Sequence, residues 1–193
     1  MDDGREDPRV VDSRARIRAA VLALVEERGL KATKVKDILA RAAVARATFY
    51  AHFEDKEAAF VGGFDLLRIA LPPGEPGAGP APVPPLGPVF AHVAEMAPLF
   101  ASVSKHGELE LPLQVARRDL GATFRAALAE LSERGFALAG PVEALAQAAT
   151  AVVLALVEGW LEEGAPGAPE ERARLAEDLV RRLVVGPSPA PDR

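Results

Sequence analysis

The stretch VKDILARAAVARATFYAHFEDK, residues 35–56, decides the fold of the N-terminal part of the chain. Two apolar sets recur in it at helical spacing: Val35, Ile38, Leu39 and Ala42, and then Phe49 and Phe53. This pattern predicts two short helices joined by a tight turn. Helices this short are unstable alone in water, so we expect the amphipathic segment before them to hold them in place. The remaining side chains of the second helix are basic, polar, aromatic or small, which suits insertion into the major groove of DNA.

A longer segment around this stretch carries a family resemblance. It reads RIRAAVLALVEERGLKATKVKDILARAAVARATFYAHFEDKEAAF, residues 16–60, and its most specific part is TFYAHFEDKE, residues 48–57. This segment resembles the DNA-binding domain of the TetR family of bacterial transcriptional regulators. The resemblance implies a three-helix domain with a helix-turn-helix, followed by a larger helical domain that binds a ligand and dimerises. Three alanines depart from the family pattern: Ala43 and Ala47, where Gly is common, and Ala45, where a Ser or Thr cap is usual.

The residues expected at DNA divide by their chemistry. Arg46 and Thr48 can read base edges, and the small Ala45 and Ala47 allow close approach. Tyr50 and His52 can donate to phosphate oxygens. Lys34 and Lys36 flank the start of a helix, where backbone amides also favour an anion. The resemblance adds Thr33 as the cap of the second helix near a phosphate and Lys56 as a backbone contact. The full predicted set is Thr33, Lys34, Lys36, Ala45, Arg46, Ala47, Thr48, Tyr50, His52 and Lys56.

The charge of the chain is divided unevenly along the sequence. The net charge is −5, which is unusual for a DNA-binding protein. Residues 13–56, however, contain ten basic and five acidic residues, so this segment is +5 and the remainder is −10. We call the basic segment the head and the acidic remainder the body. The positive charge of the head attracts it to DNA phosphates, whereas the negative charge of the body is repelled by them.

The domain organisation follows from composition and periodicity. Residues 1–12 are acidic and without periodicity, which predicts a flexible arm, and residues 13–54 form the expected DNA-binding domain, with a first helix from Arg14 to Arg28 capped by Ser13. A helix capped by Asp55 then extends to about Ala70. The expected helical body covers residues 55–185, interrupted at 72–88 by PPGEPGAGPAPVPPLGP, where eight prolines and four glycines exclude a helix. Residues 186–193 read as a flexible tail.

The body is expected to contain only helices, because no segment alternates as a strand would. Apolar stripes predict helices at 89–106, kinked at Pro98, at 112–134, at 142–163 and at 169–185. The chain is therefore predicted to be all-α. The last two helices carry more apolar surface than a small body needs, so two copies could close a four-helix interface across a two-fold axis. The family resemblance implies the same homodimer, which would bind a palindromic operator.

The resemblance also implies a small-molecule effector held within the body, whose binding changes the spacing of the two DNA-binding heads. Aromatic and other apolar residues that could line this site are Phe64, Leu67, Phe90, Met96, Phe100, Phe124 and Trp160, with His92, His106 and Gln114 as polar contacts. Aromatic and Met residues at helical spacing, however, form an ordinary core more often than they line a pocket. The sequence does not identify the ligand.

Composition limits the other functions that the chain could have. The sequence has no cysteine and three histidines, which lie outside metal-binding or catalytic spacings, and no phosphate-binding loop. We therefore expect no enzyme activity, no cofactor and no metal site. The sequence has no uninterrupted apolar run of about 18 residues and no apolar signal sequence at its charged N-terminus, which predicts a protein of the bacterial cytoplasm rather than of the membrane. The alternative is a helical adaptor that keeps the DNA-binding shape but binds a protein, and the substitutions Ala43 and Ala45 favour it.

Overall fold

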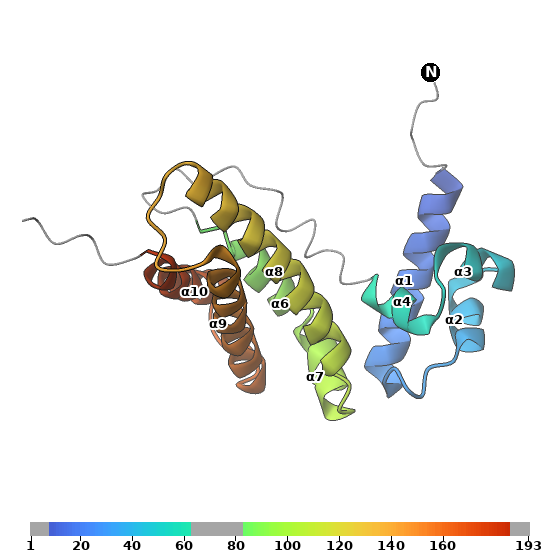
Figure 1. The fold of residues 1–193 in the computed structure, drawn as a ribbon. Helices are drawn as coiled ribbons and strands as arrows, with labels where there is room; N and C mark the ends of the chain where they lie inside the picture. The colour runs from blue at the N-terminus through green and yellow to red at the C-terminus, as the bar shows by residue number, and fades with distance from the viewer. Residues whose placement is uncertain (1–7, 63–82, 186–193) are drawn as a thin grey trace, which may run out of the picture. The chain divides into compact units, whose positions relative to one another are not determined.

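The computed structural model describes residues 8–62 and 83–185, and these residues confirm the all-α prediction. The helices, labelled as in Figure 1, are α1 (Pro8–Arg28), α2 (Val35–Ala42), α3 (Arg46–His52), α4 (Lys56–Val61), α6 (Gly87–Glu95), α7 (Ala97–Lys105), α8 (Glu110–Glu133), α9 (Val142–Glu162) and α10 (Pro169–Val184). Within the described residues, extended pairing is limited to one isolated antiparallel bridge between Leu138 and Val185.

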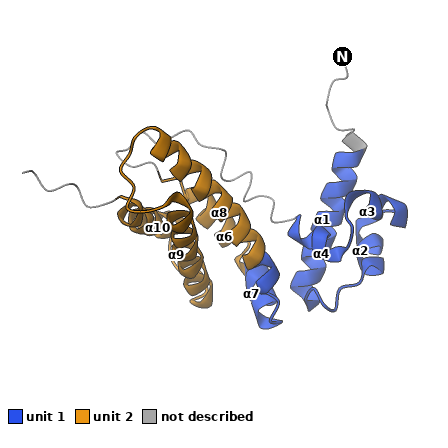
Figure 2. Cartoon of the chain, viewed as in Figure 1, with its two compact units in different colours: residues 1–65, 98–112 blue, residues 66–97, 113–193 orange. Residues whose placement is uncertain are grey.

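The chain divides into two compact units, shown in different colours in Figure 2. Unit 1 contains residues 1–65 together with residues 98–112, and unit 2 contains residues 66–97 and 113–193. The sequence placed a single boundary after residue 54. The structure shows in addition that residues 98–112 pack with the N-terminal helices, which the order of the elements along the sequence does not indicate.

In unit 1, α1 packs against α2, α3 and α4. The expected apolar stripes meet in this core: Ile17, Val21 and Val25 of α1, Ile38 of α2, Phe49 of α3 and Phe60 of α4 are fully buried. Burying a large apolar side chain stabilises a fold by roughly 1.5–3 kcal/mol, which explains how α1 holds helices that would not persist alone.

Two helix starts in unit 1 differ from the prediction. Helix α1 begins at Pro8 rather than at Arg14, so residues 8–12 belong to a helix and not to a flexible arm. Proline is favoured at the first helical position, and Asp12 forms an i,i+4 ion pair with Arg16, at 3.0 Å. Ser13 is consequently inside the helix, and its hydroxyl donates to the carbonyl of Val10. Its predicted role as a helix cap is wrong.

Thr33 does not cap α2 either. The N-cap is Lys34, in extended backbone, and it makes no side-chain cap hydrogen bond. The hydroxyl of the buried Thr33 instead donates to the carbonyl of Gly29 at 2.8 Å, closing the connection between α1 and α2. The predicted cap at Asp55 is confirmed, since its carboxylate accepts from the amide of Ala58 at 2.6 Å. Helix α4 spans Lys56–Val61, and the rest of the expected helix, residues 63–70, lies outside the described residues.

The helices of the body follow the prediction closely. The expected kink at Pro98 is a full break, because α6 ends at Glu95 and α7 begins at Ala97. Helix α8 starts two residues before Pro112, which therefore lies in its first turn. Residues 72–82 of the proline- and glycine-rich stretch lie outside the described residues, and so do the candidate ligand residues Phe64 and Leu67. Gly87 and Pro88 of this stretch begin α6, so the prediction that it contains no helical residue is wrong at its end, where a proline fits the first helical turn.

The core of unit 2 is formed where α10 packs on α9 and α6, with α8 contributing further side chains. Its largest members are Phe90, Phe124 and Trp160, and the rings of Phe90 and Trp160 lie 5.7 Å apart. By length and composition alone α9 could cross a membrane, but 44% of its most apolar window is buried inside the structure. A core helix passes the same test, and the apolar face of α9 supplies much of this core.

Candidate DNA-binding surface

Helix α3 presents one apolar face inward and one mixed face outward. Phe49 is fully buried and Phe53, just after the helix, is nearly so. Their rings lie 6.0 Å apart. The pair orients the helix, because turning it would expose both rings. The other face is exposed at Ala45, Arg46, Ala47 and Tyr50, and half-buried at Thr48. The prediction that separated the inward phenylalanines from the outward residues of α3 therefore agrees with the structure.

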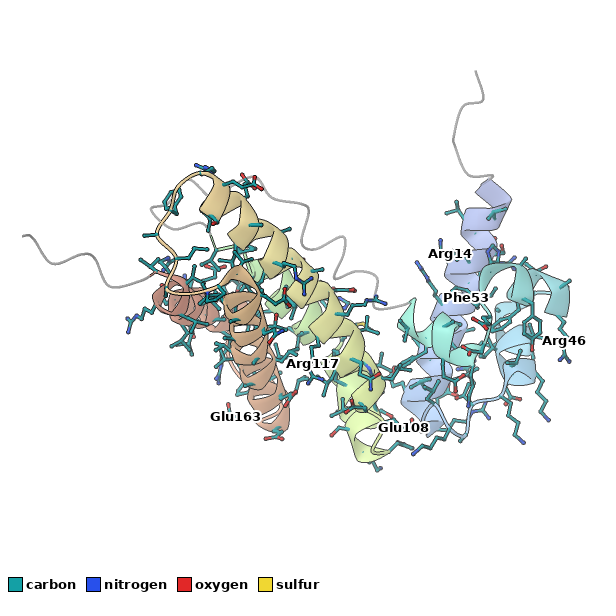
Figure 3. All side chains as sticks on the ribbon, viewed as in Figure 1. Arg14, Arg46, Phe53, Glu108, Arg117 and Glu163 are labelled. Atoms are coloured by element: carbon teal, nitrogen blue, oxygen red, sulfur yellow. The ribbon has the colours of Figure 1, made fainter. Side chains whose placement is uncertain are left out.

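Two outward residues of α3 contact each other. The guanidinium carbon of Arg46 lies 5.5 Å from the centre of the Tyr50 ring, in a cation–π arrangement. Tyr50 also meets the buried Phe49 edge to face, with ring centres 5.3 Å apart, and stays 46% exposed. The ring of Tyr50 thus packs on the buried Phe49, and the guanidinium of Arg46 packs on the ring of Tyr50. Figure 3 shows Arg46 on the outer side of α3. The arrangement orients a guanidinium that can donate to a guanine edge or to a phosphate.

The start of α2 adds two more exposed cations. Lys34 and Lys36 lie at the N-cap and in the first turn of the helix, where the backbone amides leave a partial positive charge. Lysines at this end oppose the helix dipole. An anion bound there would be attracted both by the two lysines and by the positive end of the dipole. This geometry fits the predicted phosphate contact.

Other basic residues of unit 1 form ion pairs within it. Arg28 pairs with Asp37 at 3.2 Å, and Arg41 pairs with Glu27 at 2.7 Å, so both bridges join α1 to α2. The guanidinium of Arg14 lies 5.9 Å from the ring centre of Phe53. These three arginines contribute to the positive charge of the head while bracing its helices.

His52, predicted to touch a phosphate, has a partner inside the protein. Its Nε2 lies 2.7 Å from the hydroxyl of Ser13. Because Ser13 is in α1 and His52 ends α3, this hydrogen bond fastens α3 to α1. The imidazole is half-buried in this position.

Lys56, at the start of α4, also bonds within unit 1. Its ammonium donates to the carbonyl of Leu30 at 2.7 Å, to that of Thr33 at 3.0 Å and to that of Lys31 at 3.4 Å. A lysine has three donors, so these three carbonyls account for its capacity. Lys56 therefore braces the connection between α1 and α2, and the resemblance alone did not indicate this role.

The turn between α2 and α3 contains a strained residue. Ala43 has φ 51° and ψ 48°, the left-handed conformation, and its amide donates to the carbonyl of Leu39. Glycine adopts this conformation without penalty, which explains why a glycine is the common residue at such a C-terminal cap. Ala43 is exposed, so its methyl group contributes no burial in return.

The candidate ligand residues of the body are divided between the two units. Phe100 and His106 belong to unit 1, whereas the other described candidates belong to unit 2: Phe90, His92, Met96, Gln114, Phe124 and Trp160. Trp160 is fully buried and its indole N–H donates to the carbonyl of Pro166 at 2.8 Å. Phe90, Phe124 and Trp160 belong to the core of unit 2, which is the alternative that the sequence left open, whereas Met96 is only partly buried and Gln114 is exposed.

His92 is the most unusual of these residues. It is buried, and its Nε2 has no hydrogen-bond partner. Burial lowers the pKa of its imidazole below the ordinary value, and the nearby Glu95 only partly opposes this effect. Neither around His92 nor in the rest of the described residues does a group of three or more His, Asp or Glu side chains lie so that it could hold a metal ion.

Sequence reasoning missed the intramolecular hydrogen-bond partners of His52 and Lys56. Ser13 is 39 positions from His52, and nothing in the local sequence signals their contact. Lys56 could have been suspected of a bracing role only from its place at the first turn of a short helix.

Comparison with known proteins supports the DNA-binding interpretation. Residues 17–61 match the family described as "Bacterial regulatory proteins, tetR family". No curated protein matches the chain. Similar solved structures include the tetR regulator TylP from Streptomyces fradiae, with 20% identity, 93% of this chain and 90% of that chain covered, and a TM-score of 0.61.

Two further solved structures are similar to the chain. NalD, the secondary repressor of the MexAB-OprM multidrug efflux pump in Pseudomonas aeruginosa, is 17% identical over 93% of this chain and 98% of its own, with a TM-score of 0.58. RolR, solved with its ligand resorcinol, is 19% identical over 93% of this chain and 91% of its own, with a TM-score of 0.54. At these identities the likeness establishes the fold.

Proposed function

This chain carries the DNA-binding segment and the fold of the TetR regulators, and from that premise we propose that it is a transcriptional regulator that binds a palindromic DNA operator as a homodimer. The observation that carries the proposal is the two-sided construction of α3. Phe49 is buried beneath the helix, while Arg46 and Tyr50 stand exposed and stacked on its outer face. An exposed basic and aromatic face on a braced short helix suits the major groove.

Within this proposal the predicted DNA residues have two kinds of role. Arg46 and Thr48 read base edges, Ala45 and Ala47 allow close approach, and Lys34, Lys36 and Tyr50 bind the phosphate backbone. Thr33, His52 and Lys56 act differently, since each bonds to a residue of unit 1 and sets the position of the helices that carry the contacts.

The homodimer is proposed to form through α9 and α10. Leu175 and Leu179 lie one turn apart on α10 and are 45% and 39% exposed. Ala151 and Ala155 are exposed on α9. Small residues on one helix and leucines on the other allow two copies to close a four-helix interface. The two recognition helices would then lie about 34–36 Å apart, one turn of DNA.

A repressor released by a small molecule is the further part of the proposal. NalD is a repressor, and RolR binds a small ligand, so the fold supports both properties in other proteins. In this chain, release requires that the ligand bind the DNA-incompetent arrangement more tightly than the competent one. The bacterial cytoplasm, where such an operator would lie, is the proposed location.

The proposal is tested by selecting bound duplexes from a random pool and then titrating the selected duplex at several salt concentrations. We expect a palindromic sequence, bound by two copies of the chain, whose affinity falls by about 10³-fold or more between 50 and 200 mM salt. Substituting Lys34→Gln and Lys36→Gln together should reduce the slope of log affinity against log salt by about 2.

Lys105→Gln is the matched control, because Lys105 is exposed at the end of α7 and lies outside the proposed surface. It should leave the salt slope unchanged. If no duplex is enriched and the chain binds none with a salt-dependent affinity, regulation at DNA is refuted, and the adaptor that binds a protein becomes the better hypothesis.

A further inference from the structure

Three side chains from residues 98–112 hold the end of α1 and the connection that follows it. The hydroxyl of Ser102 donates to the carbonyl of Glu26 at 2.7 Å. The imidazole of His106 lies against the backbone of Gly29, where a Cβ would come within 2.6 Å of Cδ2 of the ring. Gly29 also has φ +81°, so both its conformation and its neighbour require glycine. These contacts join distant parts of the sequence within unit 1.

Glu108 makes the strongest of these contacts. One carboxylate oxygen accepts from the amide of Leu30 at 2.5 Å, and the other accepts from the amide of Lys31 at 2.8 Å. The side chain is only 8% exposed. A buried carboxylate is costly unless it is hydrogen-bonded, and bonds from amides to a charged acceptor are about twice as strong as neutral ones. Glu108 therefore fixes the connection in a single arrangement.

The same connection is held from its other side by Lys56. The carboxylate of Glu108 takes the amides of Leu30 and Lys31, and the ammonium of Lys56 takes their carbonyls. The peptide groups between α1 and α2 thus lie between an anion and a cation in the favourable direction of their dipoles. Helix α2 begins two residues after Thr33, so a shift of this connection displaces the helix-turn-helix.

We propose that Glu108 is a positioning residue for DNA binding, which couples the placement of the helix-turn-helix to residues 98–112. This inference rests on the proposed function. The neighbours of the segment in sequence, Ala97 and Leu113, belong to unit 2, and α8 continues from Glu110 to Glu133 as one helix. Figure 3 labels Glu108 in the connection between α7 and α8. Loss of the contacts of Glu108 with Leu30 and Lys31 releases the connection, and α2 and α3 lose their fixed position.

The first test needs no DNA. Hydrogen exchange is measured by NMR on the full-length protein and on Glu108→Gln, which keeps the shape of the side chain but places an amide group where one carboxylate oxygen accepts. We expect exchange to speed up at least tenfold at Leu30 and Lys31, and also in α2 and α3. Acceleration confined to Leu30 and Lys31 would overturn the proposal, since the position of α2 and α3 would then be independent of Glu108.

The second test is the affinity for the selected duplex. Glu108→Gln should weaken binding at least tenfold without changing the salt slope, because no phosphate contact is lost. Glu133→Gln makes the same charge change at an exposed position of α8 and should have no effect. Both measurements are made well below the unfolding temperature of the variant, so that a loss of stability alone leaves the affinity unchanged. An affinity within twofold of the original protein would overturn the proposal.

The two proposals fail in different ways. If the unsubstituted protein binds no duplex, the proposed function is refuted, while the exchange measurement still decides whether Glu108 positions α2 and α3. If the unsubstituted protein binds and Glu108→Gln binds equally well, only the role of Glu108 is refuted.

Discussion

Ser13 and His52 are joined by a hydrogen bond of 2.7 Å that fastens the last residue of α3 to α1. The hydroxyl of Ser13 also donates to the carbonyl of Val10 at 3.0 Å, which uses its only hydrogen. Nε2 of His52 is therefore assigned as the donor of this bond.

Removing this bond from either side should have the same effect on DNA binding. We expect Ser13→Ala and His52→Ala each to lower the free energy of unfolding by about 1 kcal/mol. Both should weaken binding to every duplex by a similar factor, since both loosen α3. Urea unfolding and duplex titration measure the two quantities. A much larger loss of affinity for His52→Ala would show instead that the imidazole contacts DNA directly.

Ala43→Gly should stabilise the protein. The left-handed conformation costs an alanine roughly 1–2 kcal/mol, and the greater backbone freedom of glycine costs roughly 0.5–1 kcal/mol. The difference predicts a gain of up to about 1.5 kcal/mol, because the exposed methyl group of Ala43 contributes little packing. The urea midpoint measures it.

Ala42→Gly is the matched control for this substitution. Ala42 is the last residue of α2 and is buried, so glycine there should destabilise the protein by about 1 kcal/mol. A loss of stability in both variants would mean that the turn is not strained at Ala43.

The sequence predicts the inner and outer faces of α3 because this information is local. Phe49 and Phe53 are four residues apart, and burying both rings leaves one orientation for the helix. The same local logic gives the cap at Asp55 and the helices of the body. It could not show that Thr33 does not cap α2. The choice of Thr33 between capping α2 and bonding to the carbonyl of Gly29 depends on how the connection between α1 and α2 is held.

The residues that brace the site were beyond sequence reasoning for a related reason. Glu108 and Leu30 are 78 positions apart, and the segment that carries Glu108 reads as an ordinary join between two helices. A buried glutamate that binds amides looks the same in sequence as an exposed one. Lys56 was correctly placed beside the helix-turn-helix, but only the folded chain shows that its ammonium bonds to carbonyls of the protein.

Introducing charges on α10 should separate the proposed dimer. Leu175→Glu combined with Leu179→Glu places two carboxylates on the face where a second copy would bind. We expect light scattering to show half the original mass and duplex affinity to fall, because a monomer holds one half-site. Circular dichroism should be unchanged, since both leucines are exposed.

Phe136→Glu is the control for this pair, because Phe136 is comparably exposed but lies between α8 and α9. It should remain a dimer. If the Leu175 and Leu179 variant also remains a dimer, the interface lies elsewhere on the chain.

The buried His92 should make the stability of unit 2 depend on pH. Burial lowers the pKa of its imidazole in the folded chain, so the unfolded chain binds the proton more tightly. Stability is therefore fully present above the unfolded pKa, near 6.5, and is lost as the pH falls below it, by at most about 1.4 kcal/mol per pH unit. Thermal unfolding between pH 8 and pH 5 measures this loss.

His92→Leu should remove this part of the pH dependence, because leucine fills the buried site without a titrating group. The same slope in the original protein and in His92→Leu would exclude His92 as its source.

The stacking of Arg46 on Tyr50 predicts how base recognition and phosphate binding can be separated. Arg46→Ala removes the guanidinium and should relax the preference for one base pair of each half-site, at a cost of about 1–3 kcal/mol on the preferred sequence. Tyr50→Phe keeps the ring beneath Arg46 and removes only the hydroxyl, so it should weaken binding to all duplexes by the same factor. Tyr50→Ala should do both, because it also removes the support of the guanidinium. Titration of the selected duplex and its single-base variants distinguishes these outcomes. Identical specificity profiles for Arg46→Ala and Tyr50→Phe would refute the division of roles, because the hydroxyl would then read the sequence together with the guanidinium.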